Sequence, residues 1–178
     1  MKKAILIIIG ALFPLFSFAQ NTFDAFENER EVTSVVVTKN MFKLLSKMDL
    51  DSKDPEAQAY LNMVNSLDNI KIFTTENPEM QKKMDAAVKN YLSSGNKLEE
   101  LMKINDGGQE IKFFVKEGKN KNSVQELLMH LTGNVDGKHS TVIMTITGDI
   151  DLRQLSQLTS DLKVPGSEQL KNIDKKTE

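Results

Sequence analysis

The residues from Ser140 to Leu152 constrain the fold more than any other part of the sequence. Ser140–Thr147 is dense in β-branched side chains, which predicts a strand. Gly148–Asp151 follows, and a glycine with two aspartates at this place predicts a sharp turn. Leucines at helical spacing come next, with Asp151 as the residue that caps a helix. We therefore expect a central strand around which the rest of the domain packs.

The N-terminal residues follow a different pattern. Met1–Lys3 is basic, Ala4–Phe16 is apolar, and Ser17–Ala19 places small residues where signal peptidase cleaves. The apolar run is shorter than the roughly 20 residues of a membrane-spanning helix. We interpret residues 1–19 as a signal peptide, cleaved between Ala19 and Gln20. An uncleaved membrane anchor is the alternative interpretation.

Composition excludes several classes of protein. The chain has no cysteine, so disulfides, thiolate metal sites and a lipid anchor on cysteine are all excluded. Its 23 basic and 25 acidic residues are interspersed, for a net charge of −2. Removal of Lys2 and Lys3 with the signal peptide lowers that charge to about −4. Without a basic face, nucleic acid is not an expected partner.

Periodicity predicts an α+β domain. The expected elements are strand 32–38, helix 41–48, helix 54–67, strand 69–75, helix 78–93, a hairpin of 97–105 with 110–116, a segment 123–131, strand 140–147 and helix 151–162. Ser123–Leu131 fits both a helix and a strand, and we interpret it as a strand. These elements predict a mixed or mostly antiparallel sheet of about six strands, with helices packed on one face and a C-terminal four-strand meander. The domain is expected to span residues 20–162, followed by a polar tail at 163–178.

Two clusters of polar residues are candidates for ligand binding. His130 and His139 would face each other with Asp136 if the turn between them were centred at Asn134–Val135, and they could then share a metal ion. Solvated histidines beside a turn are the simpler interpretation. In the second cluster, Gly148, Asp149 and Asp151 could bind a cation or another ligand. Backbone geometry and helix capping explain Gly148 and Asp151 better than ligand binding does, which leaves Asp149 as the open candidate.

The familiar catalytic motifs are missing from the sequence. It has no G-x-S-x-G, no H-E-x-x-H and no phosphate-binding loop. The aspartates at 49, 51 and 54 fail the EF-hand pattern, because position 6 is Asp54 and position 12 is Tyr60. Most methionines lie in apolar stripes and are expected to fill the core. We expect no cofactor and no resident metal.

Three segments resemble a bacterial family described as domain of unknown function 4252. They are Glu31–Phe42, the Asp106–Gly108 hairpin and Ile143–Leu155, and the similarity covers about residues 22–162. The resemblance implies a small exported protein of Gram-negative bacteria, and it supplies no catalytic residues. Some family members look like lipoproteins, and this chain departs from them because it lacks the cysteine.

Together these features predict a protein of the periplasm or the cell exterior, soluble after signal cleavage. Its membrane contact would be transient, through the signal peptide. The expected function is non-enzymatic, either as a binding module or as a protein-interaction module of the cell envelope. Its partner would be an unidentified envelope protein or a small ligand. The alternative is a carboxylate-dependent hydrolase or a small-ligand binder that uses the Gly148–Asp151 turn.

The signal-peptide interpretation makes a direct prediction. When the full chain is expressed in a Gram-negative cell, the protein recovered from the envelope fraction should begin at Gln20. Mass spectrometry of the intact protein and of its N-terminal peptide measures this. Recovery of the uncut 178-residue chain from the membrane would instead favour the anchor.

Overall fold

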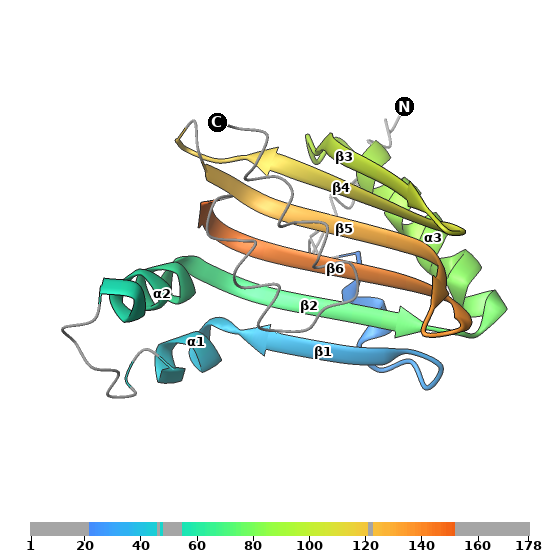
Figure 1. Ribbon diagram of the computed structural model, residues 1–178, viewed down its shortest axis with the longest axis horizontal. Coiled ribbons are helices and arrows are strands. Elements are labelled where there is room, and N and C mark those ends of the chain that lie inside the picture. The colour runs from blue at the N-terminus through green and yellow to red at the C-terminus, as the bar shows by residue number, and fades with distance from the viewer. Residues whose placement is uncertain (1–21, 46, 48–54, 121–122, 152–178) are drawn as a thin grey trace, which may run out of the picture.

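The computed structural model describes residues 22–45, 47, 55–120 and 123–151 (Figure 1). Its elements are the 3-10 turn η1 (Asp24–Phe26), β1 (Thr33–Thr38), α1 (Lys39–Leu45), α2 (Pro55–Ser66), β2 (Leu67–Thr75), α3 (Pro78–Ser93), β3 (Glu99–Asp106), β4 (Gln109–Glu117), β5 (Ser123–Val135) and β6 (Lys138–Asp151). The segment Ser123–Leu131, whose sequence fitted both a helix and a strand, lies in strand β5, so its interpretation as a strand is confirmed. None of the described helices is long and apolar enough to cross a membrane.

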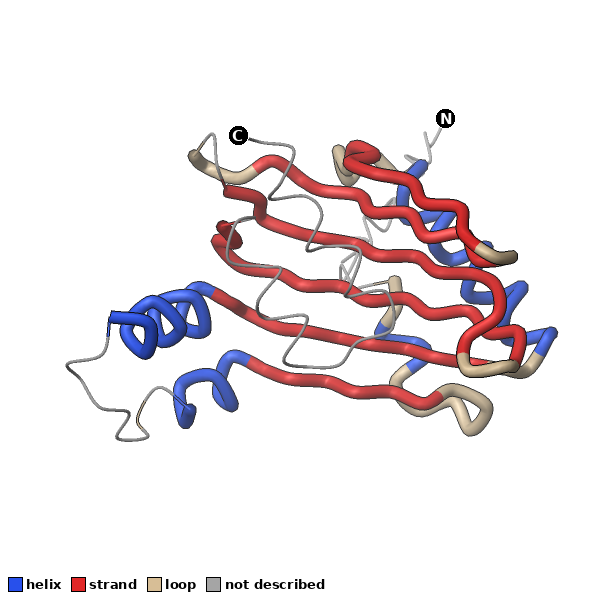
Figure 2. Tube along the Cα trace, in the orientation of Figure 1, coloured by secondary structure: helices blue, strands red, loops and turns tan. Residues whose placement is uncertain are grey.

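The six strands form one antiparallel sheet in the order β1-β2-β6-β5-β4-β3. Figure 2 shows the strands as a single layer, with α1 and α2 beyond one end of β1 and β2 and with α3 behind the sheet. The expectation of an α+β fold with a mainly antiparallel sheet is confirmed. In this order β1 and β3 are the two edge strands, and β6 lies near the middle.

Strand β6 is the most deeply buried strand. Seven consecutive residues, Ser140–Ile146, are buried, and β6 pairs along its length with β2 on one side and β5 on the other. Burial of consecutive residues means that both faces of the sheet are covered here, because neighbouring side chains point to opposite faces. The prediction of a central strand in this part of the sequence is therefore confirmed.

The helices contribute to apolar clusters on both faces of the sheet. On the α3 face, Phe73, Phe114, Leu128 and Ile143 pack with residues of η1 and α3. On the opposite face, the cluster includes sheet residues such as Phe113, Met129 and Met144, with Phe42 of α1 and Met63 and Val64 of α2. The expectation that the helices pack on one face is not confirmed.

Helix α3 begins as the sequence predicts. The side chain of Asn77 accepts hydrogen bonds from the backbone N–H groups of Glu79 and Met80, at 3.0 and 3.1 Å. Pro78 occupies the first turn, where a missing N–H costs nothing. This local signal could be read from sequence because all its parts lie within four residues.

The predicted turn at Gly148–Asp151 is wrong, because β6 continues through these residues to Asp151. Gly148 instead marks an irregularity in the pairing: it lies opposite Leu67, while Thr147 lies opposite Asn69. Its φ is +146°, and a Cβ there would meet the carbonyl oxygen of Ser66 and lie 2.8 Å from Leu67 Cα. Gly148, which the sequence suggested as a turn residue, thus allows β2 and β6 to approach each other closely. Asp151, the expected helix cap, is instead the last residue of β6. The rest of the helix expected at 151–162 and the boundaries at 19 and 162 lie beyond the described residues.

A pair of glycine substitutions should separate these contacts from backbone strain. Gly148→Ala is expected to lower the free energy of unfolding by about 2–4 kcal/mol, because it adds a clash with the β2 backbone to the cost of the unusual φ. Gly137→Ala is the control, since its φ is +85° with no atom within 4 Å of the added Cβ. Urea unfolding curves compare the two variants. If both variants lose the same free energy of unfolding, the close approach of the β2 backbone to Gly148 adds nothing to the cost of the substitution.

Candidate functional site

A polar pocket lies beside the bulge in β6. Its volume is ≈ 470 Å³ and its lining consists of Lys39, Ser66, Asp68, Lys119, Gln125, Thr147, Gly148 and Asp149. The Lys39 ammonium lies 2.5 Å from an Asp68 carboxylate oxygen, and both side chains are about half exposed. Of the three predicted site residues, Gly148 and Asp149 contribute to this lining and Asp151 does not. The pocket offers charged groups of both signs to a small polar ligand.

Catalytic chemistry in this pocket is poorly supported. Asp149 and Asp151 lie two residues apart on one strand, about 7 Å in rise, and Asp149 is exposed. The hydroxyl of Ser66 donates a 2.7 Å hydrogen bond to the carbonyl oxygen of Met63, inside helix α2. The lining contains no histidine, and of its two carboxylates Asp68 is already paired with Lys39 while Asp149 is exposed. The arrangement favours binding over reaction.

The two histidines do not share a site. The β5–β6 turn is centred on Asp136 and Gly137, so His139 lies opposite Asn134 while His130 lies opposite Ile143. The sequence hypothesis placed the turn two residues too early. Within the described ranges, no three side chains of the metal-ligating kinds gather around one point. The histidines make separate contacts with α3.

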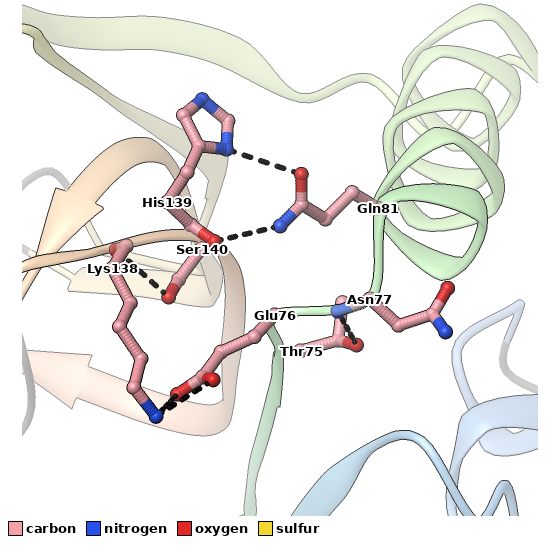
Figure 3. A network of polar contacts seen from close by, with 7 residues as sticks. All are labelled: Thr75, Glu76, Asn77, Gln81, Lys138, His139 and Ser140. Atoms are coloured by element: carbon pink, nitrogen blue, oxygen red, sulfur yellow. Dashed lines mark hydrogen bonds and ion pairs between the residues drawn. The ribbon is translucent and has the colours of Figure 1, made fainter.

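His139 belongs to a polar network that joins the β5–β6 turn to the start of α3 (Figure 3). Gln81 donates from Nε2 to the carbonyl oxygen of His139 at 2.8 Å, and its Oε1 lies 3.1 Å from His139 Nδ1. Lys138 forms an ion pair with Glu76 at 2.9 Å. In Figure 3 these side chains point toward one another from β6, from the β2–α3 junction and from the first turn of α3. The network fixes the position of the turn.

Two more polar contacts attach α3 to β5. His130 Nε2 lies 2.9 Å from an Asp85 carboxylate oxygen. The Tyr91 hydroxyl donates to the Glu126 carboxylate, at 2.8 Å to one oxygen. Burial lowers the pKa of His130, against the effect of Asp85, and burial raises the pKa of Glu126. Sequence reasoning missed both pairs because their members are 45 and 35 residues apart.

The His130–Asp85 pair has the composition of half a catalytic triad, but its surroundings argue for a structural role. In the described part of the chain, no serine or threonine hydroxyl hydrogen-bonds to the His130 ring. Both residues lie between α3 and the sheet, where His130 is largely buried. We interpret these contacts as the polar attachment of α3.

Lys71 carries a similar attachment on the same face. Its ammonium contacts carboxylates of Asp24, at 2.5 Å, and Glu27, at 2.8 Å. Burial opposes the charge on Lys71, but the two carboxylates raise its pKa. This cluster joins β2 to η1 and to Glu27, whose carbonyl oxygen also accepts a 3.0 Å hydrogen bond from the Ser34 hydroxyl of β1.

Exposed apolar side chains concentrate at the β1 edge of the sheet. Among described residues, five large apolar side chains are exposed, and four of them belong to β1 and α1: Val35 (48%), Val36 (39%), Met41 (48%) and Leu44 (63%). We call these four residues the β1–α1 surface. The fifth is Leu101 on β3, at 38%. Sequence reasoning assigned these residues to a strand and a helix but could not show that they remain uncovered.

One comparison with known proteins gives a match. A family model described as Domain of unknown function (DUF4252) matches residues 26–158, most of the chain. No curated protein and no solved structure matches the chain.

The buried His130 makes stability depend on pH. Its folded pKa lies below the ordinary 6.5, so between those two values the unfolded chain binds more protons. Stability should therefore fall as pH drops from about 7 through 6, with a slope of at most about 1.4 kcal/mol per pH unit. His130→Gln should reduce this slope, as measured by urea unfolding at several pH values.

A second histidine variant controls for this effect. His139→Gln retains His130 and should therefore retain the contribution of His130 to the slope. Glu126 has a raised pKa, so its contribution is lost as pH rises and has the opposite sign. The difference between wild type and His130→Gln isolates the histidine. Identical slopes in these two proteins would contradict the assignment.

Proposed function

The chain belongs to the DUF4252 family, and from that premise we propose that it is an exported, non-enzymatic protein-interaction module of the cell envelope. The β1–α1 surface is the observation that carries this proposal. Export is supported by the basic, apolar and small-residue order of residues 1–19. The expected location is the periplasm or the cell exterior.

Strand β1 has the properties of a strand that accepts a partner. Its sequence, Thr33–Thr38, contains no charged residue and no proline, and half of its residues are valine. It pairs with β2 on one side, and no other described strand pairs with it. Edge strands usually carry charges, prolines or bulges that prevent pairing with another chain. An unprotected edge is suited to strand addition, in which a partner extends the sheet.

Helix α1 enlarges the apolar area beside this edge. Met41 and Leu44 follow β1 directly in sequence and are 48% and 63% exposed. Isolated exposed apolar residues are common on protein surfaces, but adjacent ones are typical of interaction sites. A strand added at β1 would therefore bring neighbouring side chains against α1.

The polar pocket at Gly148 supports a second candidate function, the binding of a small ligand. Lys39, Lys119, Asp68 and Asp149 together could hold a molecule that carries both charges. The carboxylate-dependent hydrolase is the catalytic form of this alternative. We rank both below protein interaction, because Asp68 is already paired with Lys39, Asp149 is exposed and the Ser66 hydroxyl is already hydrogen-bonded.

Envelope capture with paired variants tests the interaction. Leu44→Lys should reduce recovery of a specific partner by about tenfold or more, since burial of one leucine contributes about 1.5–3 kcal/mol. Leu101→Lys is the matched control on the opposite edge and should leave recovery unchanged. Quantitative mass spectrometry of cross-linked complexes from native envelopes measures the effect. Equal recovery by the two variants would contradict the proposal.

Asp149→Asn tests the alternative. If the pocket binds a ligand or performs hydrolysis, this substitution should abolish binding or turnover while urea unfolding remains unchanged. If protein interaction is the function, Asp149→Asn should leave partner recovery at the wild-type level. A loss of activity in this variant alone would favour the small-ligand function.

A further inference from the structure

We propose that the partner strand at β1 is β1 of a second copy of this chain, paired antiparallel about a two-fold axis. This inference rests on the proposed function and names the partner of that surface. Three observations lead to it: the different chemistry of the two sheet edges, a row of apolar residues that ends at β1, and opposite charges at the two ends of the strand.

The two edges of the sheet differ in how well they can accept a strand. Strand β3 carries Glu99, Glu100, Lys103 and Asp106, and its pairing with β4 is interrupted between Glu100 and Met102. Charges and bulges of this kind discourage edge pairing. Strand β1 has neither in Thr33–Thr38. A second β1 therefore matches the uncharged surface, whereas β3 of another copy would place charged residues against valines.

A row of apolar side chains crosses all six strands and ends at β1. The paired positions follow one another as Met102, Phe113, Met129, Met144, Ile72 and Val35. Phe113, Met129 and Met144 are fully buried, but Val35 at the end of the row is 48% exposed. The row is thus incomplete at the β1 edge.

Two-fold antiparallel pairing completes this row. In such a pair, directly opposed residues lie on the same face of the sheet, so the residue at the axis meets its own copy. With Val35 at the axis, Val35 of one copy packs against Val35 of the other. The apolar row then continues without interruption into the second sheet, and each valine loses its exposure to water.

The same register brings opposite charges together. Glu31 lies four residues before Val35 and Lys39 lies four residues after it, and both are exposed. Glu31 lies in the turn before β1 and Lys39 is the first residue of α1, so antiparallel pairing about Val35 brings the Glu31 end of one copy beside the Lys39 end of the second copy, and symmetry repeats this proximity. A parallel arrangement would align like charges instead. Lys39 already contacts Asp68 at 2.5 Å, so Glu31 would join an existing ion pair.

The interface is expected to be weak in solution. Strand β1 has six residues, which gives about six backbone hydrogen bonds between the copies. Such a contact belongs to the smallest class of interfaces, with dissociation constants on the order of micromolar. The two copies should therefore exchange, and the experiment must sample concentrations above that range.

The absence of cysteine allows a clean test. Val35→Cys and Leu101→Cys each place a single thiol in the chain, on opposite edges of the sheet. At about 100 µM, well above a micromolar dissociation constant, a short bismaleimide should link most of Val35→Cys into a dimer and little of Leu101→Cys. Analytical ultracentrifugation of the processed chain should show a dimer. The dissociation constant of the dimer should be at least tenfold higher for Val35→Lys than for Leu101→Lys.

The outcomes separate this inference from the proposed function. Equal cross-linking at the two positions, or a monomer at all concentrations, overturns the pairing of two copies. If the monomeric chain still captures another envelope protein in a Leu44-dependent manner, the interaction function stands and only the partner assigned here is wrong. Dimerisation that Val35→Lys weakens and Leu101→Lys preserves, with a circular dichroism spectrum unchanged in both variants, supports the inference.

Discussion

The burial of β6 on both faces is the constraint on which the rest of the structure depends. Seven consecutive buried residues lie in this strand, between β2 and β5. Each buried Ile or Met side chain contributes about 1.5–3 kcal/mol only while water is excluded from it. Both faces of the sheet must therefore be covered. Helix α3 and η1 pack on one face, and residues of α1 and α2 join the cluster on the other.

The cover on the α3 face is positioned by polar contacts as well as by apolar packing. Gln81, Asp85 and Tyr91 reach from α3 to His139, His130 and Glu126 on the sheet. Apolar packing is non-directional, whereas these hydrogen bonds require one placement of the helix along the strands. The histidines, which looked like possible ligands in the sequence, are thus accounted for by the fold. Among the described residues, the β1 edge and the adjoining α1 carry four of the five exposed large apolar side chains.

The two edge strands of the sheet differ in charge and in the regularity of their pairing, and the proposed function depends on this difference. The charges and the irregular pairing of β3 protect that edge, while β1 presents valines and an uncharged backbone edge. Val35 is 48% and Leu44 is 63% exposed, so a large part of their apolar surface is not buried within one copy. Apolar residues in such places are best explained by contact with another surface. The proposed pairing of two copies through β1 rests on this difference between the edges.

The sequence by itself determined the features that depend on neighbouring residues. The strand nature of β6 and the Asn77 cap of α3 could be read locally, whereas the sequence of β5 fitted both a helix and a strand. Only the tertiary structure decided that Gly148 lies in a bulge against Ser66 and Leu67, that His130 meets Asp85, and that Val35 ends an apolar row uncovered. The physical reason is that strand order and helix placement bring together residues tens of positions apart. Periodicity shows which face of an element is apolar, but it does not show what covers that face.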